Sequence, residues 1–314
     1  MGTDGRPLPV TPYGRPLAGI VFAVLAVASF AVLDTATKVA SLTIPVMMAL
    51  WFRYAFQAFA TSAVLIPREG MAAAFRTSHP RFQLLRGVLL LATSVFAYFS
   101  LKFMPVGEFT AIVMIVPLVV TLLAATSLGE RVSPLRWILV AGGFTGAMVI
   151  IRPGGEGFSW AMLLPLGLVA SNSWFQMLTS RMARTENPLT THLYTGWIGL
   201  VLTSVLVPFV WITPATTVEW VALLLMGLMA TVGHFLLILA YTSAPASWIT
   251  PYLYFQIAFA MLGGWLVFSH LPDRYSVAGI ALIAVCGVAG GWLTMHEARQ
   301  QRRSAQLPVQ PIES

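Results

Sequence analysis

Residues 107–127 read GEFTAIVMIVPLVVTLLAATS, a mostly apolar stretch whose one charged residue is Glu108. A second run, WVALLLMGLMATVGHFLLILAYT, covers residues 220–242. A helix needs about 20 such residues to cross about 30 Å of hydrocarbon. Backbone polar groups inside a bilayer must be satisfied within the spanning element, which leaves only helices and closed barrels. Barrel strands are about 10 residues long and alternate in polarity, so these longer, unalternated runs predict transmembrane helices.

The composition extends this prediction to the whole chain. Its 314 residues are 58% hydrophobic and only 9% charged, whereas a soluble domain carries about 25% charged residues. Turn-forming residues separate the apolar runs, as in Met104-Pro105-Val106-Gly107. The sequence predicts ten spans, at residues 17–40, 44–66, 84–103, 107–127, 134–151, 159–181, 189–211, 219–242, 246–268 and 275–295.

The distribution of Lys and Arg predicts the orientation of the chain. With the N-terminus placed in the cytoplasm, 13 of these residues fall on the inside and 4 on the outside. This bias predicts that both termini are cytoplasmic and that the number of spans is even. Because the net charge of +7 resides in the loops, it does not indicate a nucleic-acid partner. Residues 1–16 and 297–314 are polar or rich in proline and predict disordered cytoplasmic tails.

The order of spans and breaks in the first half recurs in the second. Met104-Pro105-Val106-Gly107 precedes an apolar helix that ends at Leu128-Gly129-Glu130, and Ala244-Pro245-Ala246 precedes one that ends at Ser269-His270-Leu271. Each half has five spans, an odd number, so the second half must insert upside-down relative to the first. We predict an all-α integral membrane protein of ten helices, built from inverted five-helix repeats at 17–152 and 153–296. Transporters with such repeats bind substrate near the midplane.

A set of residues distributed over positions 17–295 resembles a known family. The set consists of Asp34-x-x-x-Lys38, Pro45, Arg53, Arg86-Gly87, Pro105, Pro117, Leu128-Gly129-Glu130 and the GAMVIIRP segment at 146–153. In their order and spacing they resemble the drug/metabolite transporter superfamily, in particular its EamA-type members. The second half departs from the family pattern, since Ser269-His270 stands where a Gly-Glu pair is usual.

The resemblance implies a ten-helix, inverted-repeat carrier in a bacterial inner membrane. Members of the family export amino acids, related metabolites or drugs, and some import compounds such as riboflavin or S-adenosylmethionine. Family membership alone does not choose among these substrates.

Charged residues inside predicted spans are the first candidates for function, because such groups are costly in a bilayer. Arg53 lies about 13 Å along its helix and either binds an anionic substrate group or pairs structurally. Asp34 and Lys38 are one turn apart, a spacing that allows an ion pair. Asp34 is a candidate for proton coupling and Lys38 for gating, or the two simply neutralise each other. His234 either moves protons and binds substrate, or is a satisfied core residue.

Polar and aromatic residues in other spans complete the predicted site. Amides can line a cavity or join helices, aromatic rings can stack on substrate or form an interfacial belt, and proline can kink a helix. The further substrate-binding candidates are Tyr98, Asn172, Trp174, Gln176, Tyr252, Tyr254 and Gln256, and the helix-kink candidates are Pro117 and Pro251.

These observations predict a secondary transporter of a small metabolite, with export of an amino acid or related compound as the first expectation. An importer of a vitamin or nucleoside-like compound is the alternative. The sequence has no Walker A motif and no His-Glu-x-x-His or Cys/His cluster, so we expect no cofactor and no metal. A lipid-modifying membrane enzyme and a channel are the rivals from other classes. The expected partners are the substrate and the bilayer, with the chain a monomer or homodimer.

Overall fold

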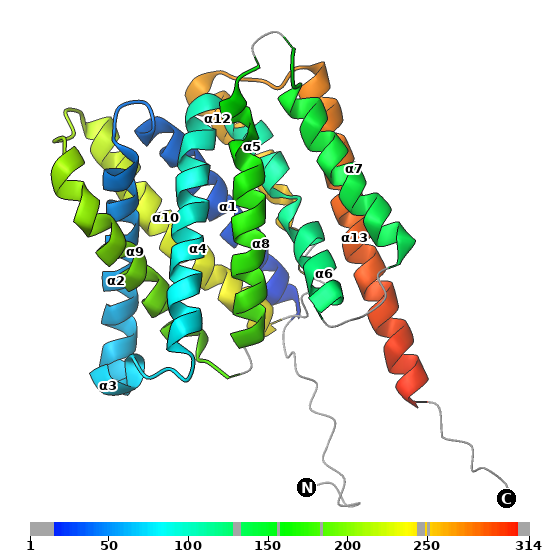
Figure 1. The fold of residues 1–314 in the computed structure, drawn as a ribbon, viewed down its shortest axis with the longest axis horizontal. Coiled ribbons are helices and arrows are strands. Elements are labelled where there is room, and N and C mark those ends of the chain that lie inside the picture. The colour runs from blue at the N-terminus through cyan, green and yellow to red at the C-terminus, as the bar shows by residue number, and fades with distance from the viewer. Residues whose placement is uncertain are drawn as a thin grey trace, which may run out of the picture.

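The computed structural model describes residues 16–127, 133–155, 158–182, 185–243, 249 and 252–306, and these form helices and loops without a strand (Figure 1). The all-helical prediction is confirmed. The helices are α1 (Pro16–Ala40), α2 (Val46–Glu69), α3 (Met71–Ala74), α4 (Pro80–Phe103), α5 (Val106–Val113), α6 (Val116–Ser127), α7 (Pro134–Ile151), η1 (Trp160–Leu163), α8 (Leu164–Met182), α9 (Pro188–Val210), α10 (Thr217–Ser243), α12 (Phe255–Phe268) and α13 (Arg274–Gln306).

Eight described helices are long and apolar enough to cross a membrane, and each coincides with a predicted span. The other two predicted spans, 107–127 and 246–268, contain shorter apolar helices, Val106–Val120 and Phe255–Phe268. One boundary was wrong: α13 continues to Gln306, whereas the sequence placed a disordered tail from residue 297. The extension is rich in Glu, Ala, Arg and Gln, which are strong helix formers.

Proline fixes where several helices begin. Pro80, Pro134 and Pro188 are each the first residue of a helix, where the missing N–H is not needed and the ring already has a helical φ. Before Pro188, the Asn187 side chain accepts a hydrogen bond from the Leu189 N–H at 2.9 Å, which is an ordinary N-cap. The prolines and the capping residue read from the sequence therefore mark where these helices begin.

The fourth predicted span is broken between α5 and α6. Pro117 lacks an N–H and its ring opposes the carbonyl four residues earlier, and the helix is interrupted at residues 114–115. The Leu118 N–H bonds to the Ile115 carbonyl at 3.0 Å instead of continuing the α pattern. The freed Met114 carbonyl accepts a hydrogen bond from the Tyr254 hydroxyl at 3.1 Å.

The contacts between the two halves of the chain follow a paired pattern. The helix α1 packs on α10 just as α8 packs on α4, and α1 contacts α12 as α8 contacts α6. The contact of α2 with α10 is matched by that of α9 with α4. The pairs α2–α9 and α7–α13 join equivalent helices of the two halves. In Figure 1, α7 and α13 run side by side at one edge of the bundle, and α2 and α9 lie at the other.

Glycine allows α7 and α13 to approach closely. A Cβ added at Gly146 would lie 2.8 Å from the Gly279 carbonyl oxygen, and one at Gly279 would lie 2.6 Å from the Gly146 oxygen. A Cβ at Gly142, one turn before Gly146, would meet the Cys286 sulfur at 2.6 Å. These small residues therefore serve helix packing inside the bundle.

We expect Gly146→Ala to destabilise the protein, because the new methyl group would press on backbone rather than on a movable side chain. Overpacking of this kind costs about 1–3 kcal/mol, which a thermal unfolding curve in detergent would register as a lower Tm. The matched control is Gly264→Ala, whose Cβ would meet nothing within 4 Å. Equal Tm values for the two variants would contradict the close approach of α7 and α13.

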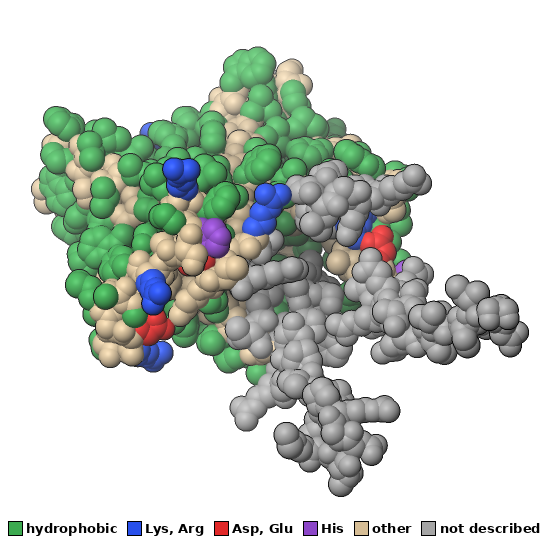
Figure 2. Space-filling view, turned by 60° about the horizontal axis from the view of Figure 1, so that its bottom comes forward, with side chains coloured by type: hydrophobic (Ala, Val, Ile, Leu, Met, Phe, Trp, Pro, Cys, Tyr) green, Lys and Arg blue, Asp and Glu red, His purple; other side chains and the backbone are tan. Residues whose placement is uncertain are grey.

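The outer surface fits a protein surrounded by lipid. Large apolar side chains such as Leu17, Phe209 and Leu266 are each more than 60% exposed, far beyond what a soluble surface tolerates. Figure 2 turns the lower end of the bundle toward the viewer, with the charged side chains gathered on that end and a mainly hydrophobic flank. The described chain begins at α1 and ends at α13 on this same side (Figure 1).

Candidate functional site

Arg53 is a buried cation in the first half of α2, 9% exposed. One terminal nitrogen donates to the Ser94 hydroxyl at 3.1 Å, and the guanidinium lies 5.6 Å from the ring of Tyr54. Its Nε atom is buried without a hydrogen-bond partner. Within the described ranges no carboxylate is near enough to form an ion pair with it. A buried guanidinium with an unused donor is costly, so this position is suited to a ligand.

Asp34 joins three helices near the same place. One of its carboxylate oxygens accepts hydrogen bonds from Thr110 Oγ1 of α5 at 3.1 Å and from Gln256 Nε2 of α12 at 3.2 Å. Arg53 is close enough to act electrostatically on this carboxylate. The carboxylate is therefore held by neutral donors from both halves. Arg53 lies nearby but does not form an ion pair with it.

Two histidines from the second half approach the same cation. The rings of His192 on α9 and His234 on α10 are tilted by 32° with centroids 5.8 Å apart, and Arg53 acts electrostatically on both. The edge of Phe30 contacts the His234 ring at a centroid distance of 5.0 Å. The histidine pair thus extends the site from α2 across to α9 and α10.

The hydrogen bonds of these histidines assign their tautomers when neutral. Gln57 Nε2 lies 3.2 Å from both His192 Nδ1 and the His192 carbonyl oxygen. A carbonyl only accepts, so the amide donates, Nδ1 accepts, and the proton of His192 lies on Nε2. That Nε2 is buried without a partner. His234 Nδ1 donates to the Ala230 carbonyl at 2.7 Å, which leaves a lone pair on its Nε2.

The structure therefore brings together Arg53, Asp34, His234 and Gln256 from the predicted set. We call this group, with Gln57, Ser94, Thr110 and His192, the central polar cluster. No group of three or more His, Cys, Asp or Glu that could hold a metal ion occurs within the described ranges.

Two tyrosines predicted to bind substrate have backbone roles instead. The Tyr98 hydroxyl donates to the carbonyls of Ala40, at 3.2 Å, and Ile44, which lie at the end of α1 and in the turn before α2. The Tyr254 hydroxyl donates to the Met114 carbonyl at the break in the fourth span. Both side chains are buried, 2% and 8% exposed, so we exclude them from the candidate site.

Lys38 likewise binds backbone carbonyls at the end of a helix. Its ammonium donates to the carbonyls of Leu101 and Met104 at 2.7 and 2.8 Å, which lie at the C-terminal end of α4, where cations are favourable. It also lies 5.5 Å from the Phe268 ring centroid. The pairing with Asp34 that the spacing allowed is not among the ion pairs of the described residues. Lys38 therefore connects α1, α4 and α12.

The predicted residues of α8 lie on opposite sides of the helix. Gln176 Nε2 donates to Asn172 Oδ1 at 2.8 Å, so these two share a face. Trp174 is two residues from each, a spacing that points it away from them, and it is 52% exposed beside exposed Ala170. Trp174 therefore faces outward, and only the two amides remain candidates for a cavity wall.

The remaining predicted residues are Tyr252, Pro251 and Pro117. Tyr252 is half-buried and its ring stacks on Phe255 with centroids 6.2 Å apart, so it stays a candidate aromatic contact. Pro251 lies outside the described residues. Pro117 marks the break between α5 and α6 described above.

The sequence reasoning missed His192 and Gln57 as members of the central polar cluster, and it missed Arg86, which acts electrostatically on His192 and His234. Gln57 lies one turn after Arg53 and therefore on the same face, a signal that was available. Arg86 is 4% exposed, donates to Thr179 Oγ1 at 2.8 Å and lies 4.7 Å from the Phe175 ring centroid. His192 follows two threonines close to a helix start, where a polar residue ordinarily indicates a cap rather than a site.

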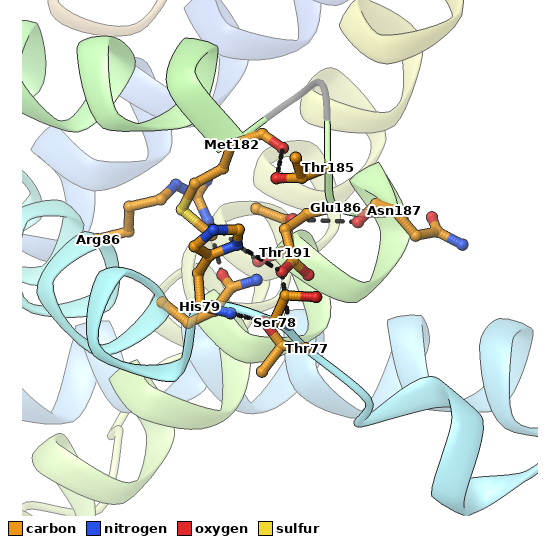
Figure 3. A network of polar contacts seen from close by, with 10 residues as sticks. Thr77, Ser78, His79, Arg86, Met182, Thr185, Glu186, Asn187 and Thr191 are labelled. Atoms are coloured by element: carbon orange, nitrogen blue, oxygen red, sulfur yellow. Dashed lines mark hydrogen bonds and ion pairs between the residues drawn. The ribbon is translucent and has the colours of Figure 1, made fainter.

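Contacts between a histidine and a glutamate join the two halves at both ends of the bundle. Glu186, in the α8–α9 loop, accepts from the Ser78 N–H at 2.8 Å and contacts His79 Nδ1 at 3.1 Å (Figure 3). Burial opposes ionisation of Glu186, but the hydrogen bonds from His79, Thr77 and Ser78 outweigh it and lower its pKa. At the other end, Glu108 of α5 contacts His270 Nε2 at 3.0 Å.

The helix pair α7–α13 is tied at both of its ends. Arg152 pairs with Asp273 at 2.6 Å, and Arg136 pairs with Glu297. The Ser276 backbone N–H, donating at 2.8 Å, and Arg152 hold the pKa of Asp273 at about 2. Since this pair is also closely packed at Gly146, α7 and α13 form one firmly joined unit.

Comparison with known proteins places this arrangement among transporters. A sequence model of the EamA-like transporter family matches residues 17–152 and again residues 159–290. A riboflavin transporter of Rhizobium johnstonii is 33% identical over 297 residues, covering 93% of this chain and 95% of that protein. A pseudopaline exporter of Pseudomonas aeruginosa is 28% identical over 278 residues, covering 87% of this chain and 95% of that protein.

A solved crystal structure has the same fold. It superposes with a TM-score of 0.62 and covers 88% of this chain and 97% of that one, at 18% sequence identity. At this identity the likeness concerns the fold alone.

Proposed function

We propose that this chain, which belongs to the EamA-like transporter family, carries riboflavin or a similar heteroaromatic metabolite across the cell inner membrane by alternating access. The family and its named relatives are transporters, so the chain is a transporter rather than an enzyme. The observation that supports the substrate proposal is the pair of buried donors without partners on Arg53 and His192, together with the lone pair that the tautomer of His234 leaves on its Nε2.

These groups supply two donors and one acceptor. Arg53 Nε–H and His192 Nε2–H are buried donors without partners, and His234 Nε2 carries a lone pair when Nδ1 donates. Riboflavin has an imide whose edge presents a carbonyl oxygen, an N–H and a second carbonyl oxygen, which is the complementary pattern. Buried polar groups left unpaired are costly, so a ligand that pairs them is favoured over one that does not.

Alternating access is supported by the relation between the halves. The family model matches the chain twice. When the helices α8–α13 of the second half are matched in order with α1–α7 of the first, the contacts between helices fall into equivalent pairs. Five spans per half, with α5–α6 and the segment ending in α12 each counted as one, give ten spans in opposite senses. The central polar cluster then lies where the halves meet, as in other inverted-repeat transporters.

The bias of Lys and Arg supports cytoplasmic termini. The described chain begins and ends on one side of the bundle (Figure 1), which is consistent with this proposal. The side with α3 and the α8–α9 loop is then the cytoplasmic side.

Export is the second candidate, and the pseudopaline exporter among the relatives favours it. The first expectation from the sequence, export of an amino acid or related compound, belongs to this candidate. Net flux measured in right-side-out and inverted vesicles, each with riboflavin and with amino acids, separates the two.

The imide test uses N3-methylriboflavin, in which the N–H donor is replaced. In sealed vesicles we expect its uptake to be slower than that of riboflavin by about tenfold or more, because His234 Nε2 would face a methyl group. The control variant Trp174→Ala should transport riboflavin within about twofold of the wild type, because Trp174 faces outward. Equal uptake of the two flavins would contradict imide recognition, and no uptake of riboflavin would contradict the proposed function itself.

A further inference from the structure

The two His–Glu contacts form a matched set that the central site does not use. In each, a glutamate carboxylate that is almost fully buried meets a partly exposed histidine. The side-chain exposures are 3% for Glu186 and 35% for His79, and 5% for Glu108 and 40% for His270. The N–O distances are also alike, 3.1 and 3.0 Å.

Each contact joins one half of the chain to the other. His79 precedes α4 in the first half, and Glu186 lies between α8 and α9 in the second. Glu108 lies in α5 of the first half, and His270 lies between α12 and α13 of the second. Since α4 runs from Pro80 to Phe103, His79 and Glu108 stand beyond its opposite ends. One contact therefore closes each face of the bundle.

The two glutamates differ in the other interactions that hold them. Glu186 also accepts from the Ser78 N–H, which belongs to the same half as His79, so opening this face breaks both contacts. Glu108 has one buried oxygen without a hydrogen bond, and Lys38 acts on it electrostatically, so this carboxylate is held by little besides His270. The histidines are the exposed partners, so each regains water when its contact opens.

The pair α7–α13 behaves differently, because ion pairs tie it at both ends at once. Contacts at both ends, with glycine packing between them, join these two helices along their length in this structure. A contact at one face only permits rocking about such a fixed pair. The His–Glu contacts are therefore placed to open in alternation while α7–α13 stays closed.

We propose that His79–Glu186 and His270–Glu108 are the two gates of the transport cycle, one on each face, and that both are closed in this structure. This inference rests on the alternating access of the proposed function. Opening toward one face breaks the contact on that face, while the other contact keeps the opposite face shut. Weakening one gate therefore shifts the population toward the state open on that side.

The test is hydrogen–deuterium exchange of the full chain in lipid nanodiscs at pH 6.5, without substrate. In His79→Gln we expect residues 75–79 and 185–187 to lose protection by about three- to tenfold. Residues 269–273 should gain protection in the same variant. His270→Gln should give the reverse pattern. Glu186→Gln should give the same result as His79→Gln, and Glu108→Gln the same result as His270→Gln.

The control is His296→Gln, since His296 stacks on Trp292 of its own helix with centroids 5.4 Å apart; neither face should change. Loss of protection at both faces in one gate variant would indicate general destabilisation and overturn the proposal. A loss of protection at the mutated face without a gain of protection at the other face, as expected for a channel, would also overturn the proposal. The assay needs no substrate, so a failure to transport riboflavin leaves its result interpretable.

Discussion

Riboflavin flux through Arg53→Met in sealed vesicles is expected to fall by about tenfold or more. The change removes the unused Nε–H donor and the central positive charge, and a hydrogen bond from a charged group contributes about 1.5–3 kcal/mol. Arg53→Lys should recover little of the flux, because an ammonium lacks the planar set of donors. Full recovery by Lys would show that charge alone matters and would contradict recognition through Nε.

The stability of the same variant separates a binding role from a structural one. An arginine that holds α2 through a buried ion pair costs about 3–5 kcal/mol when its partner is left unpaired. Within the ranges that the structure describes, the one hydrogen bond made by the Arg53 side chain goes to Ser94, and Nε has no partner. We therefore expect the Tm of Arg53→Met in detergent to equal or exceed that of the wild type. A large drop in Tm together with the loss of flux would favour the structural role.

Asp34→Asn is expected to abolish the dependence of transport on a proton gradient. The amide oxygen can still accept the hydrogen bonds from Thr110 and Gln256, but the side chain can no longer gain and lose a proton. For one coupled proton, a gradient of one pH unit supports about tenfold accumulation. In a wild-type assay with an acidic exterior we expect this accumulation, and in Asp34→Asn we expect equilibration only.

The control for this experiment is exchange without a gradient, which Asp34→Asn should still perform because its hydrogen bonds are preserved. Gradient-driven accumulation that is unchanged in the variant would remove Asp34 from the coupling step. A wild type that ignores the gradient would remove proton coupling altogether and leave facilitated transport or exchange.

The spans were predictable from the sequence because their physical cause is local. Apolar length decides where a helix can cross lipid, and proline decides where several helices begin, as at Pro80 and Pro188. Longer-range effects were less visible. The break at Pro117 leaves two short helices where one span was expected, and its freed carbonyl depends on Tyr254 from the other half. The extension of α13 was missed because polar composition was taken as disorder.

The site was predictable where a residue is out of place in lipid. Arg53, Asp34, His234 and Gln256 were identified for this reason, and the structure brings them together. Aromatic residues gave poorer predictions, because sequence alone does not say which side of a helix faces the interior. Trp174 thus faces outward, and the Tyr98 hydroxyl caps a helix end.

Contacts between distant segments explain most of what the sequence did not reveal. His192 joins the site through Gln57 and His234, which lie on other helices. His270 stands where the family resemblance leads one to expect a Glu, and its partner Glu108 lies far away in sequence. Neither relation has a signal in local spacing, because each depends on how the two halves meet.

Counterflow of riboflavin is the measurement that tests the central claim most directly. Sealed vesicles containing the protein are loaded with excess unlabelled riboflavin and diluted into a trace of labelled riboflavin. A carrier whose central polar cluster opens alternately to each side predicts a transient accumulation of label above the outside concentration, which is lost in Arg53→Met. Label that only rises to equilibrium, as through a channel, or that does not enter, would contradict the account.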